Sequence, residues 1–242
     1  MALTPAGRRL TEAHRLAQAQ LSARMAIRVR PLWRLVDPED IAGTVPGWLD
    51  AVSEIVRSQH STSVALADRY YRSFRRLETG SALSSDLDLP PLNLEALQTS
   101  LIVTGPVRVE RAIRRSEDVQ AASRLAGAMS ARAAGRHAIQ GSRETILRAV
   151  GSDRRAIGFA RATSGNPCHF CALIAGRGPV FEESSASFAA HDGCACTAEP
   201  VFSRDAEWPP GSRRYADIYQ EAAQGESDPM LAFRRAYEGR DD

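Results

Sequence analysis

Apolar residues recur at three- and four-residue spacings through most of residues 1–150, a pattern typical of amphipathic helices. The first such segment runs from about Pro5 to Val29, and Pro31 is expected to end it. A second helix is predicted to start at Asp37 as N-cap with Pro38 in the first helical position, and to be interrupted at Pro46-Gly47. Its apolar stripe comprises Trp48, Val52, Ile55, Val56, Leu66, Tyr70, Phe74 and Leu77.

Turn-forming residues divide the next part of the chain. The stretch Thr79–Pro91 has the composition of a loop, and Asn93 can cap a third helix that Gly105-Pro106 breaks. A basic segment follows, and Ser116–Val150 then predicts a long Ala-rich helix. Glycine weakens a helix interior by about 1 kcal/mol relative to Ala. The glycines of this segment are Gly127, Gly135 and Gly141.

The sequence pattern changes after Gly151, where short apolar runs alternate with Gly, Pro and Ser. The runs Gly178–Phe181 and Thr197–Phe202 predict short strands, and helical spacing returns in Arg213–Gln224 and Asp228–Tyr237. We therefore predict a mainly α protein with two parts. An extended helical region covers residues 1–150, and a small α+β cysteine-rich module with C-terminal helices covers residues 151–242.

Composition narrows the function classes. With 242 residues, 43% of them hydrophobic, the chain can bury a core, yet it contains no apolar run long enough to span a membrane and no secretory signal pattern. All 31 basic residues are Arg, but the net charge is only +2, which is too small for a general nucleic-acid binder. We expect the Arg-rich helical faces to be solvated or paired with acidic residues, and contact with DNA is the alternative.

The four cysteines all lie within residues 168–196, next to histidine. Cys168 and Cys171 form a CxxC pair, and His191, Cys194 and Cys196 form an HxxCxC group. Two short ligand pairs about twenty residues apart suit the tetrahedral N/S coordination of zinc. These five residues are the candidate ligands for four positions, whereas His169 should point away from them.

A set rich in cysteine favours a closed structural zinc site over a catalytic one, which keeps a position open. Such a site would stabilise a module poor in apolar residues. Disulfides, buried thiols and a redox CxxC are the alternatives. Asp192 and Glu199 could serve a catalytic metal, but carboxylates beside a zinc group often support the ligands without binding the metal. We expect His14, His60 and His137 to be surface or satisfied histidines, and no protease constellation can be assembled from spacing alone.

The sequence around these cysteines resembles the phage Mu F-like head-morphogenesis family, and in particular minor capsid proteins of tailed phages that infect actinobacteria. The likeness covers about residues 127–203, and its motifs lie in Phe159–Leu173, Arg177–Phe181 and His191–Phe202. The resemblance implies a protein packed in few copies inside the procapsid at the portal vertex, after assembly in the host cytoplasm. It implies that the portal protein and the major capsid or scaffold proteins are its partners, with no small-molecule substrate.

Two other functions remain open at this stage. Proteins of this kind are often labelled capsid maturation proteases, in which case His191 would act with Ser164 or a cysteine as nucleophile. The Arg-rich helices would alternatively suit an internal or ejected DNA-binding protein. The sequence favours a non-enzymatic assembly protein.

Overall fold

The computed structural model describes residues 2–179 and 188–239, and it is mainly helical, as the sequence predicts. Its elements in chain order are α1 (Pro5–Val29), a 3-10 helix η1 (Arg30–Leu35), α2 (Ile41–Thr79), α3 (Leu94–Thr104), α4 (Pro106–Arg114), α5 (Val119–Ser152), β1 (Gly158–Ala162), α6 (His169–Ala175), β2 (Thr197–Val201), α7 (Ser212–Ala223) and α8 (Pro229–Glu238).

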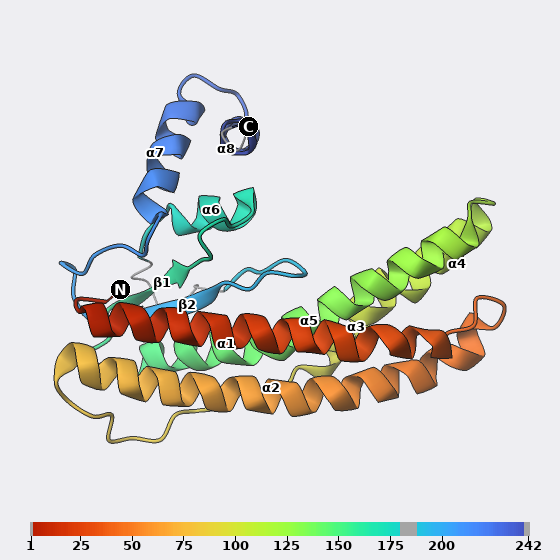
Figure 1. Ribbon diagram of the computed structural model, residues 1–242, viewed down its shortest axis with the longest axis horizontal. Helices are drawn as coiled ribbons and strands as arrows, with labels where there is room; N and C mark the ends of the chain where they lie inside the picture. Colours follow the sequence, from red (N-terminus) through yellow and green to blue (C-terminus); the bar gives the residue numbers. More distant parts are fainter. Residues whose placement is uncertain (1, 180–187, 240–242) are drawn as a thin grey trace.

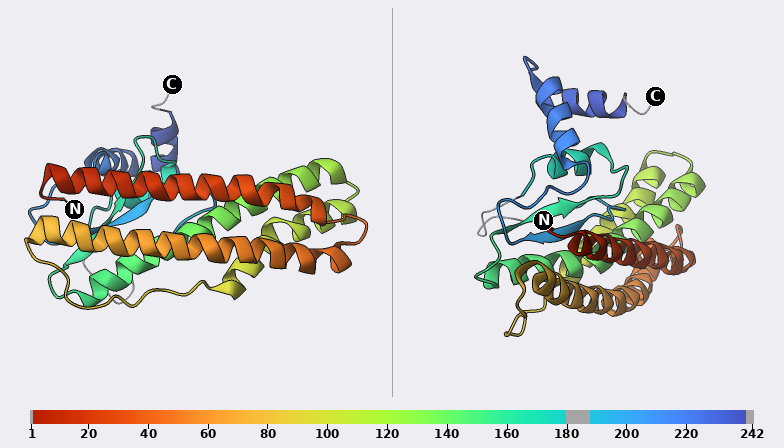
Figure 2. Two further views of the ribbon diagram at one scale, coloured as in Figure 1. Left: turned by 60° about the horizontal axis from the view of Figure 1, so that its bottom comes forward. Right: turned by 60° about the vertical axis from the view of Figure 1, so that its left-hand side comes forward.

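Three long helices form an elongated bundle. Helices α1 and α2 run antiparallel side by side, and α5 packs against both of them (Figure 1). At the far end of the bundle, α3 and α4 complete the packing around α5, as the two views of Figure 2 show. The core of this part is mainly apolar, because the stripes of the long helices face one another there. It includes Met25, Val29, Trp48, Val52, Val56, Leu97, Leu101 and Ile139.

The helix boundaries confirm much of the pattern and correct two details. Helix α1 has the predicted bounds, and Asn93 caps α3 as expected. The N-cap of α2 is Asp40 instead of Asp37, because the carboxylate of Asp37 accepts the backbone N–H of Glu39 and closes a turn before the helix. Pro46 does not interrupt α2, since it removes only one hydrogen bond near the helix start.

Two of the glycines in α5 allow other elements to approach closely. A Cβ atom at Gly127 would lie 2.7 Å from the Trp33 ring of η1, and one at Gly141 would lie 2.7 Å from Val64 of α2. Glycine therefore lowers intrinsic helix propensity in α5 but permits the packing that holds α5 in the bundle.

A two-stranded antiparallel sheet begins the C-terminal part. Strands β1 and β2 pair with Gly158 opposite Val201 and Ala162 opposite Thr197. The strand predicted in Thr197–Phe202 is confirmed as β2, whereas β1 was not predicted. Of the run Gly178–Phe181, residues 178 and 179 form no strand and the others lie outside the described residues.

The sheet and the end of the bundle share one core. Tyr70, Tyr71 and Phe74 of α2 and Ile146 of α5 belong to the same buried cluster as Ala198 of β2 and three of the cysteines. Helices α6, α7 and α8 make a smaller cluster of their own above the sheet. The cysteine-rich part is thus packed on the bundle, and the proposed division at residue 150 stays a prediction.

A buried ion pair ties α2 to the end of α5. Arg75 donates to Asp153 over 2.5 Å, and both side chains are almost fully buried. Burial alone would raise the pKa of Asp153, but hydrogen bonds from Arg75 and from the backbone N–H of Arg155 outweigh it and lower that pKa. None of the helices in the described residues has the length and apolar character needed to cross a membrane.

Candidate metal centre

The CxxC pair lies at the start of α6. Cys168 is the N-cap of this helix and is exposed, whereas Cys171 lies within its first turn and is buried. Residues three apart on a helix lie on the same face, so both sulfurs point to one side. The sequence did not predict α6, a helix of 7 residues.

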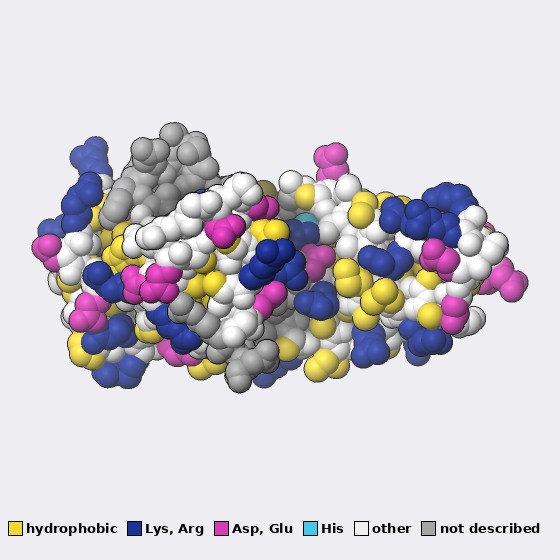
Figure 3. Space-filling model, turned by 90° about the horizontal axis from the view of Figure 1, so that it is seen from above, with side chains coloured by type: hydrophobic (Ala, Val, Ile, Leu, Met, Phe, Trp, Pro, Cys, Tyr) yellow, Lys and Arg dark blue, Asp and Glu magenta, His cyan; other side chains and the backbone are white. Residues whose placement is uncertain are grey.

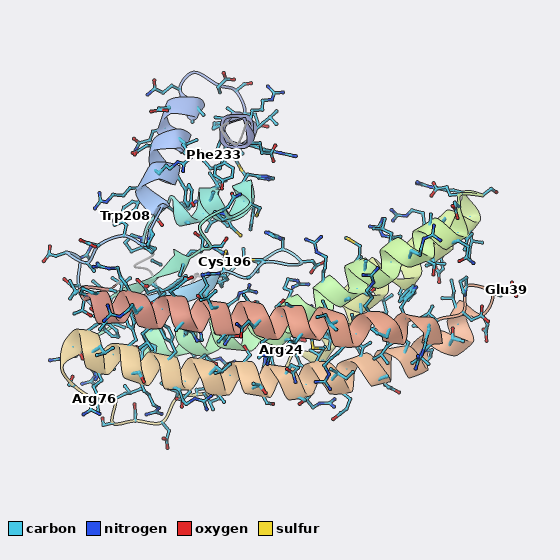
Figure 4. All side chains as sticks on the ribbon, in the orientation of Figure 1. Arg24, Glu39, Arg76, Cys196, Trp208 and Phe233 are labelled. Carbon is cyan, nitrogen blue, oxygen red and sulfur yellow. The ribbon has the colours of Figure 1, made fainter. Side chains whose placement is uncertain are left out.

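A tight turn places the other three candidates. The backbone N–H of Cys194 donates to the carbonyl of His191 over 3.0 Å, and Gly193 between them has a φ of 82°. That left-handed conformation suits glycine, and a Cβ atom there would also lie 2.7 Å from the guanidinium of Arg132. Cys196 follows directly before β2, between the sheet and the helices above it (Figure 4).

The five predicted side chains converge. His191 Nε2 lies 2.9 Å from Cys168 Sγ and 3.5 Å from Cys171 Sγ, and Cys171 Sγ lies 3.5 Å from Cys194 Sγ. They form two overlapping groups, Cys168–Cys171–His191 and Cys171–Cys194–Cys196, whose ligand atoms lie within 4.8 Å of one another in each group. Cys171 belongs to both groups and joins them.

This donor set fits zinc. With Zn–S bonds of about 2.3 Å and Zn–N bonds of about 2.0 Å, neighbouring ligand atoms of a tetrahedron lie roughly 3.5–3.8 Å apart. The 3.5 Å separations around Cys171 already match that spacing. His191 Nε2, now 2.9 Å from Cys168 Sγ, would have to move away from it by about 0.6 Å. All four cysteines are free thiols, so disulfides do not explain the cluster.

The imidazole of His191 is oriented for coordination. Its Nδ1–H donates to the backbone carbonyl of Asp192 over 3.0 Å, which leaves Nε2 to face the sulfurs. The Asp192 carboxylate accepts a hydrogen bond from Arg136 of α5 over 2.6 Å, and the ring of Phe170 packs edge-on against the imidazole. Asp192 lies outside the two ligand groups, and it contacts the imidazole through its backbone carbonyl and not through its carboxylate.

Arg143 of α5 holds the Cys194–Cys196 segment, and the sequence analysis missed this role. Its fully buried guanidinium donates to the carbonyls of Cys194 and Cys196 over 2.8 Å and 3.1 Å. A signal was present in the sequence, because Arg143 comes four residues after Ile139 and three before Ile146, on the core face of α5. An Arg on the buried face of a helix needs buried hydrogen-bond acceptors for its guanidinium.

The thiols share protons unequally. The pKa of Cys194 lies far below its ordinary value, because the thiols of Cys171 and Cys196 donate to its sulfur and Arg143 lies nearby. The same contacts raise the pKa of Cys171. At Cys196 the hydrogen bond with Cys171 lowers the pKa, but the contact with Cys194 and burial outweigh it and raise the pKa to about 11. One thiolate is therefore favoured, and ionising the other two needs a further positive charge, which a divalent cation supplies.

The remaining candidates lie elsewhere. His169 points away, as predicted, with Nδ1 2.9 Å from Glu238. His14 hydrogen-bonds Ser142 and stacks on Tyr70, so it is a satisfied core residue. Glu199 is buried in β2 and lies outside both ligand groups. Ser164 lines a different cavity, with Arg9 and Tyr215.

The fold and the site define a helical protein with a cysteine- and histidine-lined candidate metal centre. The model of the VG15 protein family matches residues 6–222, which include the whole centre, and the chain belongs to this phage-associated family. Comparisons with curated proteins and with solved structures gave no significant match.

Proposed function

We propose that this protein is a minor capsid protein of a tailed phage, acting in head morphogenesis near the portal, with a structural zinc site. The convergence of Cys168, Cys171, His191, Cys194 and Cys196 carries the proposal. A phage-associated family, the resemblance to Mu F-like proteins around those residues, and a long helical bundle suited to docking on a larger assembly all support it.

In this proposal four of the five candidates bind the ion, and its role is mechanical. The bound zinc supplies charge that keeps the thiolates ionised and joins α6 to the segment that leads into β2. Arg143 and Asp192 hold the backbone and the imidazole in place around it. The ion thereby closes the C-terminal module over the end of the bundle.

Metal analysis tests the zinc site. Protein purified under reducing conditions should carry about one zinc per chain. Replacing Cys171, the residue common to both groups, by Ser should abolish that content. Cys194→Ser and Cys196→Ser form a matched pair, and the variant that keeps zinc identifies the spare thiol. Wild-type protein that binds no metal under these conditions contradicts the site.

Particle analysis tests the assembly role. Mass spectrometry of purified procapsids should find the protein at low copy number, and procapsids that lack the portal protein should contain much less of it. Its absence from procapsids would reject the assembly role while leaving the zinc site standing. If procapsids with and without the portal protein contain equal amounts of this protein, only its location at the portal is rejected.

One contact favours a second candidate, a cysteine protease. The exposed Cys168 Sγ lies 2.9 Å from His191 Nε2, which is the geometry of a nucleophile beside its base. Co-expression with the major capsid and scaffold proteins separates the two functions. A protease shortens one of those subunits and loses this activity in Cys168→Ala, whereas the assembly protein leaves their masses unchanged.

A further inference from the structure

A groove lies at the end of the bundle away from the cysteine-rich part. The end of α3, helix α4 and the first turns of α5 enclose a space of about 560 Å³. In the space-filling view, apolar side chains are flanked by basic ones at this end of the molecule (Figure 3). No step of the proposed zinc site uses this surface.

The floor of the groove is apolar and open. Val103 of α3 is 59% exposed and Leu125 of α5 is 50% exposed, and both line it together with Val107, Ala121 and Ala122. Apolar side chains on neighbouring helices with this exposure are typical of a surface that another helix covers. A helix placed there would pack against α4 and α5 as a further member of the bundle.

The walls of the groove are basic. Among the described residues, neither Arg108 nor Arg111 forms an ion pair, and the buried Nε–H of Arg108 has no acceptor. Arg115 pairs with Glu117 at 3.8 Å, but both side chains are largely exposed, so this pair contributes little.

We propose that this groove binds an acidic amphipathic helix of a protein partner. Apolar side chains of that helix would cover Val103 and Leu125, and its carboxylates would face Arg108 and Arg111. A nucleic acid fits less well, because the floor of the groove is apolar and offers no polar groups to the edges of bases. This inference rests on the proposed function and specifies the chemistry of the partner surface.

Photocrosslinking in infected cells tests the groove. A benzoylphenylalanine at Leu125 should crosslink to one protein segment that carries Asp or Glu and repeats apolar residues at helical spacing. The same group at Ile27, which is exposed on α1 and outside the groove, should not give that product. The double variant Arg108→Glu/Arg111→Glu should reduce the yield about tenfold or more, since like charges then face each other.

Arg24→Glu is the matched control for charge, because Arg24 is exposed on α1 and outside the groove (Figure 4). It should leave the yield unchanged, and circular dichroism checks that each variant is folded. Crosslinks to DNA, to a second copy of this chain, or to no molecule overturn the proposal. Procapsids from the same cells are analysed in parallel. Procapsids that contain the protein without the crosslink reject the groove alone, and procapsids without the protein reject the assembly role.

Discussion

Different interactions stabilise the two halves of the molecule. The distal bundle buries long apolar stripes, with Trp48, Val52 and Leu97 almost completely covered. The cysteine-rich part has a sheet of two short strands and short helices, and its centre contains sulfur, imidazole and the buried guanidinium of Arg143. Burial of apolar surface stabilises a long helix without any ligand, whereas a cluster of thiols is costly to ionise without a cation.

The two halves nevertheless meet in one core. Phe74 and Tyr71 of the bundle pack in the same cluster as Cys171, Cys194 and Cys196. The bundle therefore provides the apolar surface that the C-terminal module lacks. Two perturbations therefore distinguish the halves. Removal of the metal should affect the module alone, and truncation of a side chain in the shared core should affect both parts.

Metal removal should have the largest effect and should fall on the module. Structural zinc contributes on the order of 10 kcal/mol to the folding of small zinc modules. Chelation should therefore remove hydrogen-exchange protection in α6 and in the segment from His191 to β2, while α1 and α2 stay protected. Measuring exchange by mass spectrometry, before and after zinc is restored, checks this expectation. Equal loss of protection in α1 would show that the two halves unfold as one unit.

Truncation in the shared core should have the next largest effect and should reach both parts. Phe74 is fully buried, so Phe74→Ala should lower the free energy of unfolding by about 3–5 kcal/mol. Urea denaturation followed by circular dichroism measures this change, and exchange should increase in both α2 and β2. Leu77→Ala, on the same helix but 48% exposed, is the control and should change stability much less. An unchanged β2 would contradict the shared core.

The sequence predicted the elements that depend on interactions between residues close together in the chain. Helix α1 and the cap at Asn93 follow from spacing and capping chemistry alone. Strand β1 escaped prediction because its residues Gly-Phe-Ala-Arg-Ala are all buried and show no alternation of polar and apolar positions. Its partner β2 comes more than thirty residues later, so only tertiary pairing defines it.

The candidate site shows the same limit. Cysteine and histidine spacing predicts which residues could share an ion, and the structure brings all five of them together. Spacing could not show that Cys171 joins the two groups. It also could not show that Arg143, some fifty residues earlier, binds the carbonyls of the Cys194–Cys196 segment. Those facts depend on how α5 packs beneath the module.

For each residue involved, acid should produce the smallest effect, and in the bundle it should arise from buried histidine. Burial lowers the pKa of His14 to about 3, from about 6.5 in the unfolded chain. The unfolded state then binds more protons than the folded state, so the stabilisation is complete above about pH 6.5 and declines as the pH falls towards 3. Each pH unit within that range costs about 1.4 kcal/mol, and lowering the pH from 7 to 5 should cost on the order of 2 kcal/mol for His14. His137, whose pKa burial lowers to about 4, adds a similar loss.

Urea denaturation at pH 7 and at pH 5, followed through the helical signal, measures this loss. His14→Gln should reduce the difference between the two pH values, because the buried imidazole is then absent. Metal ligands must also be deprotonated, so acid should release zinc from the module over a similar range. Zinc content measured on the same samples separates the two causes. If His14→Gln retains the full pH dependence, His14 does not account for it, and the expectation for this residue is wrong.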